Sequence, residues 1–315
     1  MKLRIGIIGL MGLIAAESSI AGAQNIPPKN RINARVVRYL TAPADQPLVM
    51  PTDVALDSNN RVYVADGVND RIIRFTPQGA VDLIMTAPSG EKLNQPVGLA
   101  IDPNDQLWIA DSGNHRVVVI SPEGIHINSM DLPPAAHGEP PDPTDLAISS
   151  FGRRCYVVDN NNHRLLIRDN LTGNWTIMGQ KGRALGQFDY PMMICIGIEQ
   201  YIYLTETMGS RIQRISPTDR WSGLIGGWGV ELGQLYRPKG IAADKDGRIF
   251  VSDSTLQVIQ VFGPWGRVNG VLCDEQGRTL RFNHPMGMDF DSQGLLYVVE
   301  LAANRVALVS LLEEN

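Results

Sequence analysis

The chain has 315 residues, with 28 Lys and Arg against 33 Asp and Glu, which gives a formal net charge of −5. This acidic balance argues against nucleic acid or an anionic membrane surface as a partner, because proteins that bind polyanions concentrate positive charge. Three cysteines form no dense disulfide framework, and their odd number leaves at least one unpaired within a monomer.

Residues 1–23 have the layout of a secretory signal peptide. Lys2 and Arg4 precede an apolar run over residues 5–16, and small residues follow at 21–23. The run is too short to span a bilayer, and no later run reaches the roughly 20 residues that a transmembrane helix needs. We therefore expect cleavage near Ala23, a linker over residues 24–33, and a periplasmic or secreted mature protein.

A short pattern recurs six times from residue 51 onward, at intervals of 45 to 48 residues. Each copy begins with a proline, and an apolar run then ends in an acid that stands five residues before an arginine. A period in this range is typical of a β-propeller. The prolines are Pro51, Pro96, Pro143, Pro191, Pro238 and Pro285; the acids are Asp66, Asp111, Asp159, Glu206, Asp253 and Glu300; the arginines are Arg71, Arg116, Arg164, Arg211 and Arg305, with Val258 in the fifth copy.

Each copy contains four β-rich runs separated by turn formers, as in residues 54–56, 62–64, 71–75 and 81–84 of the first copy. This predicts an all-β fold, a six-bladed β-propeller with four-stranded antiparallel blades. The sixth copy lacks a fourth run. We expect residues 35–40 to supply it, closing the ring within a single domain over residues 34–315.

The acid and the arginine have a structural interpretation. The acid can accept turn amides, and the arginine can bind it across the hairpin in a fork-like hydrogen bond. Because the pair occurs in five copies, whereas an active site is needed only once, we expect partly exposed structural pairs that contribute about 1 kcal/mol each. Cys155 and Cys195 align with apolar residues of the other copies and are expected to be buried; Cys273 could be free or paired between chains.

Residues 111–117 (Asp-Ser-Gly-Asn-His-Arg-Val) and 159–165 (Asp-Asn-Asn-Asn-His-Arg-Leu) resemble the signature of NHL repeats. Gly-Gln-Phe at 186–188 and Gly-Gln-Leu at 233–235 are similar to the lead-in of an NHL blade. The resemblance, of an exported bacterial type, implies a six-bladed propeller. It leaves function open, because the family includes binding modules, sensor domains and a few enzymes.

Function is expected where one copy departs from the others, on the face where the blade-to-blade loops and the loops after the acids converge. Asp289 is one departure, because it stands where other copies have alanine or cysteine, so its carboxylate must be paired, hydrogen-bonded or protonated. The candidate catalytic residues are Asp142, Tyr190, Arg237, His284 and Asp289, the first four of which directly precede a proline and could bind a polar ligand together.

Two enzyme families with a similar fold suggest metal sites. Peptidyl-hydroxyglycine lyases hold zinc with three histidines, but only His284 falls in the corresponding ring here. Propellers of the gluconolactonase and paraoxonase type bind calcium in the channel, and Asp53 and Asp145 could supply carboxylates to that ion. The other interpretation of these aspartates is an ordinary turn at the start of a strand.

Methionines gather at the predicted channel mouth. They could pack, form an adaptable partner surface or, less simply, bind Cu(I). The predicted partner face consists of Met50, Met192, Met193, Met208, Met286, Lys239 and Arg237. The proline-rich connection over residues 131–143 could add a docking element, or be a neutral insertion.

The leading hypothesis from the sequence is an exported, non-enzymatic binding or scaffold propeller that presents its loop face to a protein or polymer. The alternative is a lactonase-like or peptidyl-hydroxyglycine-lyase-like hydrolase or lyase with a cation at the channel mouth, near Asp53, Asp145 and His284.

Overall fold

The computed structural model describes residues 26–88, 90–135 and 138–312. The predicted signal peptide and the first two residues of the predicted linker lie outside the described residues. Within the described part of the chain, no helix is both long enough and apolar enough to cross a membrane.

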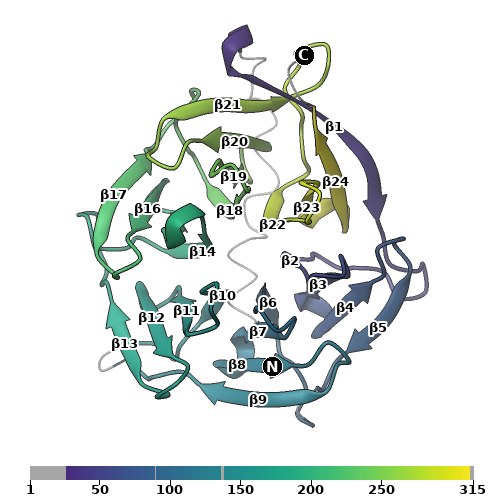
Figure 1. Ribbon diagram of the computed structural model, residues 1–315, viewed down its shortest axis with the longest axis vertical. Helices are drawn as coiled ribbons and strands as arrows, with labels where there is room; N and C mark the ends of the chain where they lie inside the picture. The colour runs from purple at the N-terminus through teal and green to yellow at the C-terminus, as the bar shows by residue number, and fades with distance from the viewer. Residues whose placement is uncertain (1–25, 89, 136–137, 313–315) are drawn as a thin grey trace, which may run out of the picture.

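The described chain is built from short antiparallel sheets arranged in a nearly closed circle (Figure 1). Each of the first four repeats forms one four-stranded sheet, with its strands paired in chain order. The strands of repeats 1 and 2 are β2 (Asp53–Leu56), β3 (Val62–Asp66), β4 (Arg71–Phe75), β5 (Val81–Met85), β6 (Pro96–Ile101), β7 (Leu107–Asp111), β8 (Arg116–Ile120) and β9 (His126–Asp131). Those of repeats 3 and 4 are β10 (Pro143–Ile148), β11 (Arg154–Asp159), β12 (Arg164–Asp169), β13 (Trp175–Met178), β14 (Pro191–Ile196), β15 (Ile202–Glu206), β16 (Arg211–Ile215) and β17 (Trp221–Gly226).

Repeats 5 and 6 share an eight-stranded sheet with the N-terminal strand, in the order β18-β19-β20-β21-β1-β24-β23-β22. Its strands are β1 (Arg31–Leu40), β18 (Pro238–Ala243), β19 (Ile249–Asp253), β20 (Val258–Phe262), β21 (Val268–Cys273), β22 (Pro285–Phe290), β23 (Leu296–Glu300) and β24 (Arg305–Leu311). Five single-turn 3₁₀ helices complete the elements: η1 (Pro28–Asn30), η2 (Gly67–Asn69), η3 (Ser112–Asn114), η4 (Ile198–Gln200) and η5 (Leu301–Ala303).

Strand β1 joins the two ends of the described chain. It pairs antiparallel with β24, from Ala34 opposite Leu311 to Leu40 opposite Val306. Its first three residues also pair in parallel with β21, with Arg31 opposite Val271. The strand therefore begins three residues before the predicted start of the repeat domain, and Figure 1 shows it on the rim beside β24 and β21.

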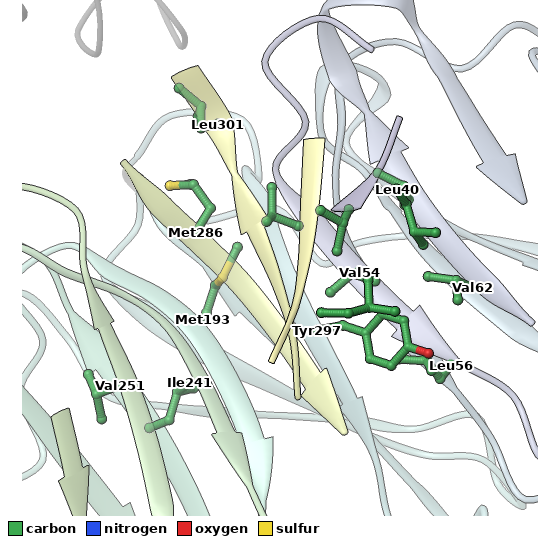
Figure 2. Packing of buried hydrophobic residues seen from close by; sticks show 14 of the residues in the cluster. Leu40, Val54, Leu56, Val62, Met193, Ile241, Val251, Met286, Tyr297 and Leu301 are labelled. Atoms are coloured by element: carbon green, nitrogen blue, oxygen red, sulfur yellow. The ribbon is translucent and has the colours of Figure 1, made fainter. Parts of the chain in front are cut away.

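Apolar side chains fill the gaps between neighbouring repeats. Four clusters each lie between one pair of adjacent repeats. A fifth cluster combines residues between repeats 6 and 1, such as Val54, with residues between repeats 4 and 5, such as Ile241. Met193 and Met286 belong to this cluster, and Figure 2 shows them between those two groups. Thioether side chains suit such irregular space.

Val258, the residue that replaces the arginine of the pattern, lies in a separate apolar cluster. It packs with Ile26, Leu256, Val271 and Cys273. Ile26 is 5% exposed, and its carbonyl accepts a hydrogen bond from Arg31 Nε at 2.9 Å. The fifth repeat thus departs from the pattern because its apolar edge receives the N-terminal segment.

We expect Ile26→Ala to lower the free energy of unfolding by about 2 kcal/mol, because it removes buried methyl groups from this cluster. Urea unfolding of the chain from residue 24 onward measures the change. Ile125, which is 65% exposed, provides the control substitution Ile125→Ala. Equal effects of the two substitutions would contradict the docking of Ile26.

Candidate functional site

The repeated acids and arginines hold each lead-in loop to its own sheet. Asp111, for example, accepts hydrogen bonds from Arg116 Nε and from the backbone N–H of Asn94, both at 2.8 Å. In repeat 1, Arg71 also donates to the carbonyl of Pro47 at 2.8 Å. In repeats 1 to 4 the acids are 0% exposed and the arginines 6–9% exposed, so these pairs are more buried than the sequence predicted. Their contacts are structural.

The histidines of the repeat signature connect neighbouring repeats. His115 Nδ1 lies 2.6 Å from the carbonyl oxygen of Pro141, in the lead-in to repeat 3. His163 Nδ1 accepts the backbone N–H of Tyr190 at 3.1 Å, and the two rings meet edge to face with centroids 4.6 Å apart. Burial lowers the pKa of His163, with a contribution from the charge of Lys181. Both histidines therefore have structural roles between neighbouring repeats.

Three aspartates on the first strands of their repeats, buried Asp53 and Asp145 and half-buried Asp289, each bind the next repeat. Asp53 accepts the N–H of Leu99 at 2.8 Å, and Asp145 accepts that of Ile194 at 2.8 Å. Asp289 accepts the N–H of Leu56 at 2.9 Å, so its carboxylate is hydrogen-bonded, which is one of the three states that the sequence allowed. The preceding repeat makes room for Asp53, because a Cβ at Gly287 would overlap its carboxylate.

Burial raises the pKa of all three carboxyls. The pKa of Asp145 rises to about 8 and that of Asp289 to about 6. Burial raises the pKa of Asp53 well above its ordinary value, with a further contribution from the charge of Asp145. Among the described residues, no three His, Cys, Asp or Glu side chains are grouped so that they could hold a metal ion. Asp53 and Asp145, the predicted calcium ligands, use carboxylate oxygens to accept backbone N–H groups.

The cysteines lie away from reactive surroundings. Cys155, Cys195 and Cys273 are all free. Cys155 and Cys273 are fully buried, and Cys195 is half-buried against the central cluster. Burial raises the pKa of Cys155 to about 12, so its thiol is protonated at neutral pH.

A group of exposed aromatic and thioether side chains lies on the loop face of repeats 4 and 5. We name it the repeat 4–5 patch, formed by Tyr190, Met208, Trp228, Tyr236 and Arg237. Trp228 is 75% exposed, Met208 45% and Tyr190 39%. The rings of Trp228 and Tyr236 have centroids 6.3 Å apart, and the Arg237 guanidinium lies 6.0 Å from the Tyr236 ring and contacts Met208 Sδ.

Lys239 lies beside this patch, one residue after the proline that opens repeat 5. The residue is 8% exposed. Burial and the charge of Arg237 lower the pKa of its ammonium group to about 8, against an opposing contribution from Asp253.

The predicted catalytic residues do not form one connected group. Within the described ranges, no hydrogen bond or ion pair links any two of Asp142, Tyr190, Arg237, His284 and Asp289. Asp142 binds Asp159 through its backbone N–H at 3.0 Å, and burial with the Asp159 charge raises the pKa of Asp142 to about 6. His284 Nδ1 lies 3.1 Å from the side-chain oxygen of its neighbour Asn283.

The predicted partner face is only partly accessible. Met193 and Met286 are 1% and 2% exposed, because they belong to the apolar cluster that combines residues between repeats 4 and 5 with residues between repeats 6 and 1. Met50 and Met192 are half-buried against the same cluster, so Met208 is the exposed methionine of the set. That part of the prediction is wrong for Met193 and Met286, which are core residues.

Trp228 was missed by the sequence reasoning because it stands in a lead-in loop rather than in a strand. A comparison of lead-in loops provides the signal that was overlooked. Lys181 and Trp228 make the equivalent parallel bridges to Phe188 and Leu235, and both are exposed, so the fifth repeat has an aromatic side chain where the fourth has a lysine.

The NHL repeat family model matches residues 48–75 and 93–120, which cover repeats 1 and 2 up to the ends of their third strands. The chain carries NHL repeats in these two segments and has a β-propeller fold. Protein brain tumor of Drosophila melanogaster is 28% identical over 132 residues, which is 41% of this propeller and 12% of that protein. The propeller therefore spans only a small part of that relative.

Solved structures with the same fold belong to proteins of different kinds. A streptogramin B lyase has a TM-score of 0.65 at 15% identity, over 89% of this chain and 98% of that one. A gluconolactonase from Xanthomonas campestris has a TM-score of 0.64 at 15% identity, over 92% and 99%. An auxiliary nutrient binding protein from Bacteroides thetaiotaomicron has a TM-score of 0.64 at 15% identity, over 88% and 74%. At these identities the likeness shows the fold alone.

The raised pKa of Asp145 makes the stability of the propeller depend on pH. The carboxyl ionises near 3.8 when unfolded and near 8 when folded, so its contribution is fully present below pH 3.8 and is lost as the pH rises toward 8. We expect Asp145→Asn to flatten the fall in unfolding free energy between pH 5 and pH 9, because the amide has one acceptor oxygen, like the protonated acid. Urea unfolding at both pH values measures this, with exposed Asp45→Asn as the control; equal slopes in the two variants would contradict it.

Proposed function

We propose that this NHL-repeat β-propeller is a non-enzymatic binding module that holds a protein partner on its loop face. The observation that carries the proposal is the repeat 4–5 patch, in which Trp228 is 75% exposed beside Tyr236, Met208 and Arg237. Tryptophan, tyrosine, methionine and arginine are the side chains enriched in the centres of protein interfaces, where they contribute most of the binding free energy.

Hydrogen bonds hold the backbone that carries the repeat 4–5 patch. The backbone N–H of Thr207 donates to the carbonyl of Tyr190 at 2.9 Å, and that of Gly209 donates to the carbonyl of Asp189 at 3.1 Å. These two bonds fix both sides of Met208. The backbone N–H groups of Tyr236 and Arg237 both donate to Asp253, at 2.7 and 3.0 Å. Side chains held on an ordered backbone lose less conformational entropy when a partner binds.

A six-bladed ring closed by β1, with one domain over residues 34–315, is part of this proposal. The six antiparallel pairs between Ala34–Leu40 and Val306–Leu311 support closure, because they give the three strands of repeat 6 a fourth neighbour. A closed ring removes the open edges that would let β1 or β24 pair with other chains.

We place the module outside the cytoplasm, in the periplasm or beyond it, on the basis of the signal-peptide pattern in residues 1–23. The alternative function is a hydrolase or lyase with calcium or another cation at the channel mouth. The fold likeness to a lyase and a gluconolactonase supports that scaffold in general. The binding role is preferred because Asp53 and Asp145 direct their oxygens to backbone N–H groups.

Substitution of Trp228 tests the binding role. We expect Trp228→Ala to weaken capture of a partner from an envelope extract by at least about 10-fold, because truncating a central aromatic side chain commonly removes about 2 kcal/mol or more. Quantitative pull-down with the purified mature chain measures the loss. Phe151→Ala is the matched control, since Phe151 is 91% exposed in the β10–β11 hairpin on the opposite face.

Unfolding temperatures should be unchanged in both variants. Equal capture by the two variants would contradict a binding role of the loop face. Stoichiometric, tightly held calcium that is lost in Asp53→Asn and Asp145→Asn would favour the alternative function.

A further inference from the structure

Lys239 differs from the other buried basic side chains of the pattern. The arginines of repeats 1 to 4 are buried with an acid within 2.7 or 2.8 Å of Nε. Lys239 is 8% exposed, yet within the described ranges its ammonium group has neither a hydrogen bond nor an ion pair. Every fully buried side-chain nitrogen or oxygen of the described chain has a hydrogen-bond partner, so the Lys239 ammonium group keeps some contact with solvent. Because this cation has lost most of its hydration, the site gains free energy from an anion that reaches it.

Arg237 brings a second cation to the same place. Its guanidinium contacts Met208 Sδ and faces the ring of Tyr236, and no carboxylate of the described chain forms an ion pair with it. Its charge acts on Lys239, lowering the pKa of that ammonium group. Only Pro238 separates the two residues at the start of β18, so two cations lie close together on a chain whose formal net charge is −5.

Asp253, the acid whose charge acts on Lys239, already accepts hydrogen bonds from other groups. Its two oxygens accept four backbone N–H groups, those of Tyr236, Arg237, Thr255 and Leu256, at 2.7 to 3.2 Å. In the other repeats an arginine Nε bonds to this acid, and here Val258 takes that position. The negative charge of Asp253 is thus directed to the lead-in loop and does not form an ion pair with Lys239.

The floor of the site is closed by packed side chains. The hydroxyl of Thr205 donates to the carbonyl of Lys239 at 2.7 Å and accepts the N–H of Met193 at 3.0 Å. These bonds fix the backbone of Lys239 beside Met193, which is buried in the central cluster with Met286. The approach left to a ligand is from the loop face, where Arg237 contacts Met208.

We propose that Lys239 and Arg237 form a receptor for a carboxylate carried by a polypeptide partner. The proposal rests on the proposed function, because it names the group that the loop face recognises. A guanidinium presents two parallel N–H donors that match the two oxygens of a carboxylate. The thioether and aromatic surroundings favour a carboxylate group over a phosphate group, because each carboxylate carries one charge, whereas a phosphate carries more charge on a single group and loses more hydration on entry.

Binding of glutarate to the full mature chain tests the receptor. Isothermal titration calorimetry at pH 7 should show glutarate binding at least about 10-fold more tightly than glutaramide, its neutral analogue. Lys239→Met should weaken glutarate binding at least about 10-fold, as expected when one member of a close charge pair is removed. Lys181→Met is the matched control, because Lys181 is an exposed lysine in the lead-in of repeat 4, and it should leave the affinity within about 2-fold of the original.

A second readout comes from the lysine itself. In the chain labelled with ¹³C at lysine Cε, saturating glutarate should raise the pKa of Lys239 by about one unit or more, because an adjacent anion favours the ammonium form. No change in this pKa would overturn the receptor. If Lys239→Met fails to fold, Arg237→Met and Lys239→Arg replace it, with loss of affinity in the first and retention within about 3-fold in the second.

Further measurements identify the type of anion and distinguish failure of the carboxylate receptor from failure of the binding function. Inorganic phosphate binding more tightly than glutarate would overturn the carboxylate assignment. Two tetrapeptides distinguish a side-chain carboxylate from a chain terminus. An acetylated, amidated peptide containing Glu has only a side-chain carboxylate, and a peptide acid containing Gln has only the terminal one. If Trp228→Ala abolishes partner capture while Lys239→Met leaves it unchanged, the carboxylate receptor is wrong and the binding function stands.

Discussion

The structure depends on hydrogen bonds from the side chains of one repeat to the backbone of the next. Sheets in a propeller do not pair through their first strands, so the backbone groups of those strands need other partners where they face a neighbouring repeat. Asp53, Asp145 and Asp289 accept N–H groups of the next repeat. Hydroxyl groups satisfy the carbonyls in the same region: Thr52 to Val97, Thr144 to Met192, Thr205 to Lys239 and Ser252 to Met286, at 2.7 to 2.9 Å.

Features that involve residues close in the chain could be predicted from the sequence, whereas contacts between distant segments could not. The strands and the acid and arginine pairs were predictable, because each involves residues close in the chain and the period repeats the same surroundings. The burial of Met193 and Met286 could not be predicted, because it depends on contacts between side chains of non-adjacent repeats. Trp228 was missed because a loop residue has no periodic position. The packing of Ile26 against Val258 was missed because these residues lie far apart in the sequence.

The same scaffold occurs in a lyase, a gluconolactonase and a nutrient binding protein, so function follows from the side chains placed on the loops. In this chain the carboxylates near the axis are used between repeats, whereas Lys239 and Arg237 of repeat 5 form no ion pair with an acid among the described residues. The single substitution of arginine by Val258 contributes twice. Val258 gives the N-terminal segment an apolar surface to pack against. It also leaves Asp253 without an arginine partner, so that Asp253 accepts only backbone N–H groups.

The pairing of β1 with β24 also sets the order in which the molecule can form. Ala34 is among the first residues of the described chain to be synthesised, and its partner Leu311 is among the last. The outer strand of repeat 6 therefore waits for almost the whole chain, and contacts of such long sequence separation form slowly. Until then β1 is an unpaired edge open to other chains, so completion of the polypeptide, rather than the stability of any one repeat, governs protection from aggregation.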